Sequence, residues 1–204
     1  MGRPRQHDES TRAALLAAAE TIVAERGPAG LSVRAVADAA GTSTRAVYSL
    51  FGSKDGLLVE ALARDAFEFL YAEIDKLEET DDPVADLIDV GVLVFRRLVR
   101  EHPALYRIAF QRVVQGLEAS AELTATRQRA WVQLVGKLER LERAGLLGGK
   151  PAPEAAAEFN SMMEGLGNAE LRGSVLRLLP EGREEEAWRN ALATVVRGFG
   201  PAGS

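Results

Sequence analysis

The chain has 204 residues, of which 47% are hydrophobic and 27% charged, and its formal net charge at pH 7 is -5. A hydrophobic share of this size allows a buried core in one large or two small domains, which excludes a chain that is disordered over most of its length. The net negative charge argues against a protein that coats nucleic acid without regard to sequence, although it is compatible with a local binding face.

Helical periodicity runs through nearly the whole chain, and Gly or Pro recurs at spacings that suit helix ends. We predict a first helix over residues 8–26, ended by the sequence RGPAG, and then a short helix VRAVADAA that Ser32 can cap. Gly41 follows as a residue able to adopt positive φ, and a third short helix is predicted over about 44–50. A long fourth helix is predicted over residues 53–77.

The remaining chain is predicted to form five more helices. The fifth follows the turn EETDDP and stops at EHPA, and a sixth starts at Pro103, which suits a first helical position. Three further helices are predicted over residues 119–144, 154–173 and 184–199, with RAGLLGGKPAP as the clearest linker. The chain is therefore predicted to be all-α, with about nine helices.

Two short helices around a tight turn at Gly41 are typical of a helix-turn-helix, whose second helix lies in the major groove of DNA. In the segment AGTSTRAVYSLFGSKDGLL, Ser43 is the predicted N-cap, so that Thr44 and Arg45 are the first exposed side chains. Arginine can bind guanine O6 and N7 in bidentate fashion, and threonine can contact thymine. The pattern therefore predicts base contacts at the start of this helix.

The rest of the same segment divides into contacts with phosphate and contacts with the core. Tyr48, one turn further on, can reach a phosphate with its hydroxyl group, and Lys54 adds a positive charge for another phosphate. Val47 and Phe51 are four residues apart and are predicted to face the core. Taken one by one, these residues favour the alternative interpretation, which is a set of polar residues on a short solvent-exposed helix. The resemblance of the ordered set to a known family favours the DNA-reading helix instead.

The segment VRAVADAAGTSTRAVYSLFGSKDGLL resembles the DNA-binding signature of the TetR family of bacterial regulators, over roughly residues 10–60. The matching residues are Ala37, Ala40, Gly41, Ser43, Tyr48, Phe51, Ser53, Lys54 and Leu57. Thr42 and Leu50 depart from the family pattern, which usually has an apolar residue at the first position and often a polar or aromatic one at the second. The segment FNSMMEGLGNAEL also resembles a subgroup with a Trp/His-Gly signature, with Glu164 where that subgroup commonly has His.

The resemblance implies two domains and a set of DNA contacts. Residues 1–52 are the predicted helix-turn-helix domain, with a flexible arm over 1–8, and residues 53–204 are a helical ligand-binding and dimerisation domain. The predicted DNA contacts are Ser32, Arg34, Thr42, Ser43, Thr44, Arg45, Tyr48, Ser49 and Lys54, with Arg3 and Arg5 in the arm. The arm is predicted to reach a neighbouring minor groove, and the alternative is a disordered tail.

The resemblance also implies a homodimer that binds a palindromic DNA operator and an unidentified small, largely apolar effector. The predicted dimer interface consists of Phe159, Leu166, Trp188, Leu192, Val195 and Phe199. From periodicity alone, the alternative is that these helices pack within one chain. The predicted effector contacts are Phe67, Tyr71, Phe95, Tyr106, Phe110, Trp131, Asn160 and Met163. Aromatic and methionine side chains of this kind are also common in a plain protein core.

We expect no enzyme, because the sequence carries no HExxH motif, no phosphate-binding glycine loop and no cysteine. Its two histidines, His7 and His102, lie far apart in the sequence, and neither a metal site nor a cofactor is predicted. No apolar run approaches the roughly 18 residues that a membrane span requires. The N-terminus also has no apolar segment typical of a secretory signal, so we expect a cytoplasmic protein.

These observations predict a sequence-specific DNA-binding transcriptional regulator, in the form of a homodimeric repressor that an effector releases from its operator. An activator on the same scaffold is compatible with the same sequence. A further alternative is an all-α protein–protein adaptor that keeps the helix-turn-helix shape without reading DNA.

Overall fold

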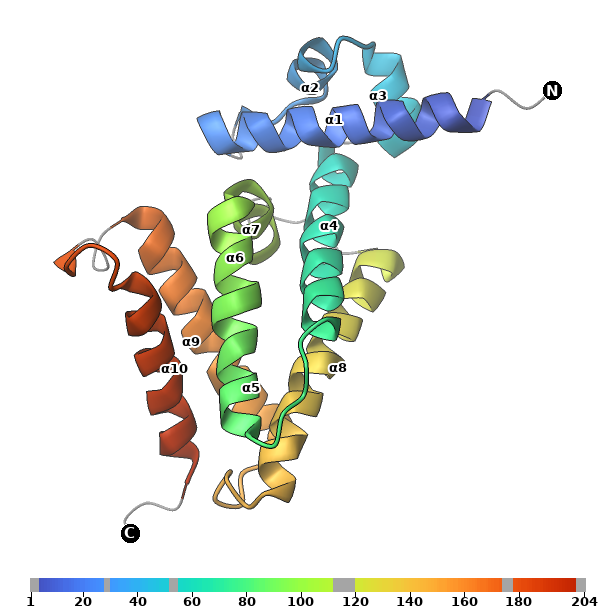
Figure 1. Ribbon diagram of the computed structural model, residues 1–204. Helices are drawn as coiled ribbons and strands as arrows, with labels where there is room; N and C mark the ends of the chain where they lie inside the picture. The colour runs from blue at the N-terminus through green and yellow to red at the C-terminus, as the bar shows by residue number, and fades with distance from the viewer. Residues whose placement is uncertain (1–3, 28–29, 52–54, 112–119, 174–177, 201–204) are drawn as a thin grey trace. The chain divides into compact units, whose positions relative to one another are not determined.

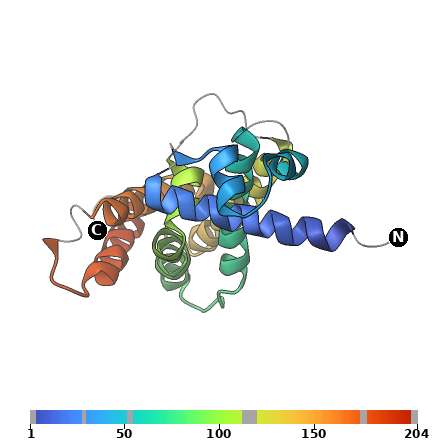
Figure 2. The ribbon, with the colours of Figure 1, turned by 90° about the horizontal axis from the view of Figure 1, so that it is seen from above.

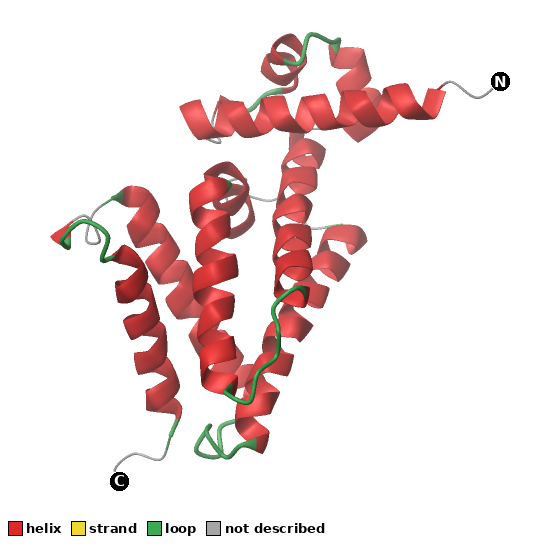
Figure 3. Cartoon of the chain, in the orientation of Figure 1, coloured by secondary structure: helices red, strands yellow, loops and turns green. Residues whose placement is uncertain are grey.

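The computed structural model describes residues 4–27, 30–51, 55–111, 120–173 and 178–200. Over these ranges the chain is helical and contains no strand, and α5, η2 and α6 follow one another without a break (Figures 1 and 3). Counting these three as one helix gives nine helices in the described ranges, so the predicted all-α fold is confirmed. None of the described helices is both long and apolar enough to cross a membrane.

The chain divides into two compact units, residues 1–67 with 103–126, and residues 68–102 with 127–204. The division falls within two long helices, α4 (Asp55–Asp75) and α8 (Ala121–Arg143). It differs from the predicted boundary after residue 52 because α7 (Pro103–Phe110) packs against α1 in the first unit. The predicted functional division into a DNA-binding and a ligand-binding domain stays a prediction.

Three helices begin the first unit: α1 (Pro4–Arg26), α2 (Val33–Ala39) and α3 (Thr44–Phe51). They contact one another pairwise, as the views from the side and from above show (Figures 1 and 2). Their shared core contains Leu15, Val36 and Val47, each at most 1% exposed. Helix α1 begins at Pro4, before the predicted start at residue 8, and the predicted flexible arm over 1–8 stays a prediction. Proline suits a first helical turn because the amide hydrogen it lacks would have no helical partner there.

The second unit contains a long helix with a change of helical type in its middle. Its parts are α5 (Pro83–Asp89), the π-helical turn η2 (Val90–Phe95) and α6 (Arg96–Glu101), and α9 (Ala152–Arg172) and α10 (Glu184–Phe199) pack nearby. The Asp82 side chain caps α5 by accepting hydrogen bonds from the backbone amides of Val84 and Ala85, each at 3.0 Å. The π turn was not predicted, because the residues VGVLVF fit the ordinary helical period.

Gly91 in the π turn permits a close approach by α10. A Cβ atom at this position would lie 2.3 Å from Cδ1 of Leu192, which is fully buried. We expect Gly91→Ala to lower the free energy of unfolding by about 1–3 kcal/mol, because the added methyl group overpacks the core. Urea unfolding measures this change.

Gly136 in α8 provides the matched control for Gly91. A Cβ atom there would meet nothing within 4 Å. Gly136→Ala is therefore expected to stabilise the protein by up to about 1 kcal/mol, since alanine loses less backbone freedom in a helix. If Gly91→Ala raised the free energy of unfolding as much as Gly136→Ala, Leu192 would not pack closely on the π turn.

Candidate nucleic-acid interface

The turn between α2 and α3 depends on a left-handed glycine. Gly41 has a φ angle of +63°, its amide donates to the Asp38 carbonyl at 3.2 Å, and the Thr42 amide donates to the Ala37 carbonyl at 2.9 Å. These two bonds form a Schellman closure of α2, in which glycine adopts positive φ without the steric cost of a side chain. The positive φ predicted for Gly41 is confirmed, and the turn sets the direction in which α3 leaves α2.

Both short helices begin with a serine cap. The Ser32 hydroxyl accepts a hydrogen bond from the Ala35 amide at 3.2 Å, and the Ser43 hydroxyl accepts one from the Ala46 amide at the same distance. Each bond satisfies a backbone donor that has no partner within its helix. The predicted caps are confirmed, and they hold the first turns of α2 and α3 in place before any DNA is bound.

Helix α3 has one buried face and one exposed face. Val47 and Phe51 are 1% and 7% exposed, which confirms the prediction that they face the core. The exposed side chains are those of Thr44, Arg45, Tyr48 and Ser49. The helix therefore presents a polar face with hydroxyl groups and a guanidinium, the donors that protein–DNA interfaces use for bases and phosphates.

The other predicted DNA contacts lie in several environments. Arg34 is exposed on α2, and its guanidinium lies 3.9 Å from the Asp38 carboxylate, a contact that adds little stability at the surface. Thr42 is half-buried in the turn, as is Leu50 in α3. The residues Lys54 and Arg3, and the side chain of Arg5, lie outside the part of the structure that is described.

Three of the predicted effector contacts form an aromatic cluster in the first unit. The ring of Phe110 stacks on Tyr106 at a centroid distance of 5.2 Å and lies 5.4 Å from the ring of Phe67. Phe67 and Tyr106 are buried. The cluster joins α7 to α4 within that unit and is apolar except for the phenol of Tyr106.

The other five predicted effector contacts belong to the second unit: Tyr71, Phe95, Trp131, Asn160 and Met163. Phe95 and Met163 are buried, whereas Tyr71, Trp131 and Asn160 are half-buried. The ring of Tyr71 carries the guanidinium of Arg129 at 5.2 Å, and the amide of Asn160 donates to the Glu164 carboxylate at 2.7 Å. The eight residues thus divide between the two units.

Four of the six predicted dimer contacts are core residues of one chain. Phe159, Trp188, Leu192 and Phe199 are at most 3% exposed, while Leu166 and Val195 are half-buried. The four buried side chains pack within their own chain, as the alternative interpretation expects, and the predicted dimer interface stays a prediction. Periodicity identifies the apolar stripe of a helix, but not whether its own chain or a second copy covers that stripe.

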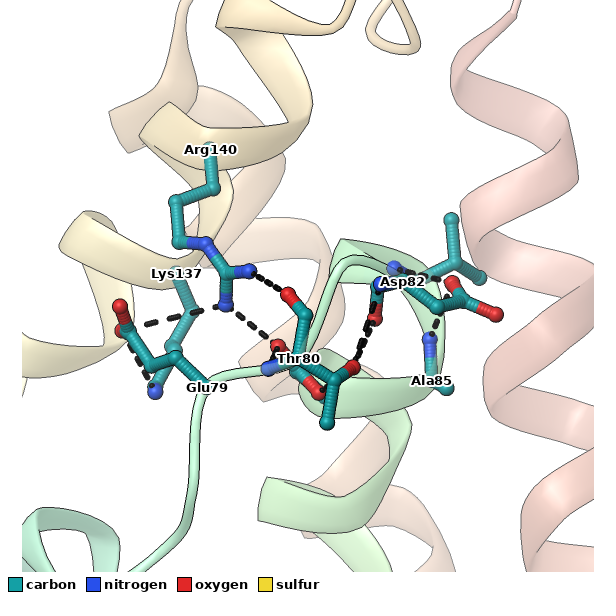
Figure 4. Close-up of polar contacts among 8 residues, drawn as sticks. Glu79, Thr80, Asp82, Ala85, Lys137 and Arg140 are labelled. Carbon is teal, nitrogen blue, oxygen red and sulfur yellow. Dashed lines mark hydrogen bonds and ion pairs between the residues drawn. The ribbon is translucent and has the colours of Figure 1, made fainter.

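A polar cluster joins the loop before α5 to α8, and the sequence analysis did not identify it (Figure 4). The Asp86 carboxylate, 5% exposed, accepts hydrogen bonds from the amide and hydroxyl of Thr80 at 2.9 and 2.7 Å and from Arg140 at 2.5 Å. Arg140 also donates to the Thr80 carbonyl at 2.5 Å, and Lys137 pairs with Glu79 at 2.9 Å. The cations of α8 lie more than 50 positions from these partners in sequence, and no local motif signals them.

The electrostatics of this cluster fit an anchor rather than an acid–base site. Burial alone would raise the pKa of Asp86, but the hydrogen bonds from Thr80 and Arg140 outweigh it and hold the pKa below the ordinary value of 3.8. The hydrogen bond to Asp86 in turn raises the pKa of Arg140. Both groups therefore stay charged at neutral pH, and their hydrogen bonds are directed at each other and at the Thr80 backbone.

Removing the Asp86 carboxylate is expected to destabilise the second unit. Asp86→Ala should lower the free energy of unfolding by roughly 3 kcal/mol, because it leaves the Arg140 guanidinium without its buried partner. Folding lowers the pKa of Asp86, so the ionised carboxylate stabilises the folded protein. This stabilisation is complete at pH values above the ordinary carboxyl pKa and is lost as the pH falls through the pKa of Asp86 in the folded protein. Urea unfolding between neutral and acid pH measures both effects.

Two variants complete this measurement. Asp86→Asn should show a shallower loss of stability in acid than the wild type, because the amide does not titrate. Glu142→Gln, on an exposed position of α8, should follow the wild-type profile. An Asp86→Asn profile that runs parallel to the wild type would contradict the role assigned to this carboxylate.

Two family models match separate parts of the chain. The family model described as "Bacterial regulatory proteins, tetR family" matches residues 15–61, and the model described as "Tetracyclin repressor-like, C-terminal domain" matches residues 91–195. The first match contains α2, the turn at Gly41 and α3, and the second covers about half of the chain.

Curated relatives and solved structures agree with these matches. An HTH-type transcriptional regulator of Mycobacterium tuberculosis is 32% identical over 129 residues, which are 61% of this chain and 54% of that protein. The chain thus spans about half the length of the curated relatives it matches. The TetR family transcriptional regulator PfmR from Thermus thermophilus superposes with a TM-score of 0.68 at 24% identity, over 93% of this chain and 99% of that one.

A protein of unknown function from Rhodococcus sp. RHA1 has the same fold, with a TM-score of 0.76 and 23% identity over 92% of this chain and 94% of that one. At these identities the solved structures establish the fold, and the family matches establish the relationship. The chain therefore belongs to the TetR family of bacterial regulatory proteins, and residues 15–61 contain the helix-turn-helix of its DNA-binding domain.

Proposed function

We propose that this protein is a homodimeric repressor that binds a palindromic operator and is released by a small, largely apolar effector. The observation that carries the proposal is the exposed polar face of α3, held on the core by Val47 and Phe51. Thr44 and Arg45 lie in its first turn, where a recognition helix contacts base edges. The protein then acts in the cytoplasm, where it meets both its operator and its effector.

The proposed base contacts come from Thr44 and Arg45, with phosphate contacts around them. Arg45 is suited to bidentate hydrogen bonds with guanine, and Thr44 to thymine. The proposed phosphate contacts are Ser32, Arg34, Thr42, Ser43, Tyr48, Ser49 and Lys54, with Arg3 and Arg5 near the N-terminus. Ser32 and Ser43 are N-caps, so they contribute by orienting the helix starts toward phosphate as much as by their own hydroxyl groups.

The proposed dimer interface lies on the exposed faces of α9 and α10. On α9 the exposed residues Ala157, Ser161 and Gly165 recur every fourth position, and Met162 lies beside them. On α10 the corresponding exposed residues are Asn190, Thr194 and Gly198. A Cβ atom at Gly165 or Gly198 would meet nothing within 4 Å in its own chain, so the space above these helices is open.

Small exposed side chains at this spacing suit close packing against the same helices of a second copy. A two-fold arrangement would place two α3 helices about one DNA turn apart, roughly 34–36 Å, and would require a palindromic operator. Leu166 and Val195, both half-buried, are proposed to extend the same interface. The buried residues Phe159, Trp188, Leu192 and Phe199 would hold α9 and α10 in the positions that such an interface requires.

The proposed effector is small and largely apolar because its candidate contacts are mostly aromatic side chains and methionine. These candidates are Phe67, Tyr106 and Phe110 in the first unit and Tyr71, Phe95, Trp131, Asn160 and Met163 in the second. Release would require the effector to bind the DNA-free form more tightly than the DNA-bound form. By linkage, operator then weakens effector binding by the same factor.

Selection of genomic fragments by the purified full-length protein tests the proposal. We expect enrichment of fragments that share a palindrome with half-sites centred about 10 base pairs apart. The genes beside the enriched sites would then supply candidate effectors, which are tested for release of the protein from the selected palindrome. Enrichment no better than that of random DNA would instead favour an adaptor that keeps the fold without reading sequence.

A further inference from the structure

A cation–π contact joins α1 to the last residue of α3. The guanidinium carbon of Arg12 lies 5.6 Å from the centroid of the Phe51 ring. Arg12 is half-buried and Phe51 is 7% exposed, so this contact forms at the edge of the core. Among the described residues, Arg12 forms no ion pair, and its charge is therefore directed at the ring.

Because this contact lies at the end of α3, it can affect the orientation of the helix and of its exposed face. The helix has only eight residues, and its buried residues, Val47 and Phe51, are one turn apart. If the packing of Phe51 loosens, α3 is held at Val47 alone and can tilt about that residue. A tilt about Val47 would displace the first turn, where Arg45 must meet a base within hydrogen-bond distance, about 2.7–3.2 Å.

The residue type at position 12 also fits a contact with an aromatic ring. A guanidinium is planar and weakly hydrated, so it stacks on a ring better than the ammonium of lysine. Such contacts are weak at exposed sites and stronger when water is excluded. A contribution of this size is too small to determine whether the domain folds, but it is enough to bias the orientation of a short helix.

We propose that Arg12 is a positioning residue for sequence discrimination, which acts on Arg45 and Thr44 through Phe51 without contacting DNA. The proposal rests on the base contacts proposed above for α3. It differs from the usual role of an arginine in a DNA-binding domain, which is direct attraction to phosphate. The two roles predict different responses to salt and to base-pair changes.

A double-mutant cycle in the full-length protein tests the role of Arg12. The variants are Arg12→Met, Phe51→Leu and the double variant, with Arg26→Met as the matched control at an exposed position of α1. Fluorescence anisotropy measures binding to the selected palindrome and to the same palindrome with one base pair changed in each half-site, at several salt concentrations. Hydrogen exchange of the α3 amides in the free protein gives a readout that does not involve DNA.

We expect Arg12→Met to reduce discrimination between the two DNAs by about 3–10-fold, leaving the salt slope unchanged and speeding α3 exchange relative to α2. Phe51→Leu should have a similar effect, and the double variant should be no worse than the more affected single variant. Arg12→Lys should restore part of the discrimination, and Arg26→Met should change neither readout. Urea unfolding verifies that each variant is folded. If Arg12→Met does not fold, Arg12→Lys is compared with the wild type in its place.

Three results would overturn the proposal. Equal loss of affinity for both DNAs, with a salt slope lower by about one per protomer, would show that Arg12 binds phosphate. Additive effects in the cycle would show that Arg12 does not act through Phe51. Unchanged discrimination and unchanged α3 exchange would show that the contact positions nothing. If the wild type itself does not discriminate between the two DNAs, the proposed function fails. Faster hydrogen exchange of the α3 amides in Arg12→Met would then show that Arg12 has a purely structural role.

Discussion

Replacing Arg45 by alanine is expected to lower affinity for the operator by about 1–3 kcal/mol per half-site and to relax specificity at one base pair in each half-site. The side chain is exposed in the first turn of α3, so its removal leaves the core of the domain intact. The loss should therefore appear in binding and not in the free energy of unfolding. Competition between the selected palindrome and its single-base variants measures the change at each position.

Arg34→Ala is the matched control for Arg45, because Arg34 is an exposed arginine on the neighbouring helix that is proposed to contact phosphate. It should weaken binding to all sequences alike and reduce the salt slope by about one per protomer. A uniform loss from both variants would place Arg45 on the phosphate backbone, and no loss from either would favour the adaptor.

The second large effect is expected from Gly165→Arg on the exposed face of α9. An arginine there meets nothing in its own chain at the Cβ position, so the protomer should fold normally. Between two closely packed copies it has no room, and we expect a monomer. Because one monomer engages only one half-site, operator affinity should fall by on the order of 100-fold or more, as expected when two linked contacts become independent.

Sedimentation or light scattering measures the mass of the Gly165→Arg variant, and anisotropy measures its operator affinity. Ala125→Arg is the matched control, because it places the same side chain on an exposed small residue of α8. We expect this control to remain dimeric with wild-type affinity. A dimeric Gly165→Arg variant would move the interface away from this face of α9.

The local features of the candidate site were predictable from the sequence because their causes lie within a few residues. Ser32 and Ser43 cap amides three positions away, and Gly41 closes α2 with bonds that span three and five positions. Val47 and Phe51 fall on one face of α3 because a helix repeats every 3.6 residues. A short segment therefore contains all the residues on which each of these features depends, and the structure confirms the two caps, the turn and the buried face.

The sequence was less informative where the partner of a residue is distant along the chain. Trp188 and Leu192 lie on an apolar stripe that either a partner chain or their own chain can cover, and they are buried in their own chain. The contact between Arg12 and Phe51 and the bonds of Asp86 to Arg140 join residues on different helices. No repeat or spacing in the sequence reports which helices meet.

The sequence by itself determined the all-α fold, the turn at Gly41, the two serine caps and the polar face of α3, because hydrogen bonds and periodicity within a helix are local. Only the tertiary structure decided which apolar stripes are covered, where α10 approaches the π turn at Gly91, and which cations meet Asp86 and Phe51. The physical reason is that packing and charge pairing depend on distances between helices, and helices brought together by folding can be far apart along the chain.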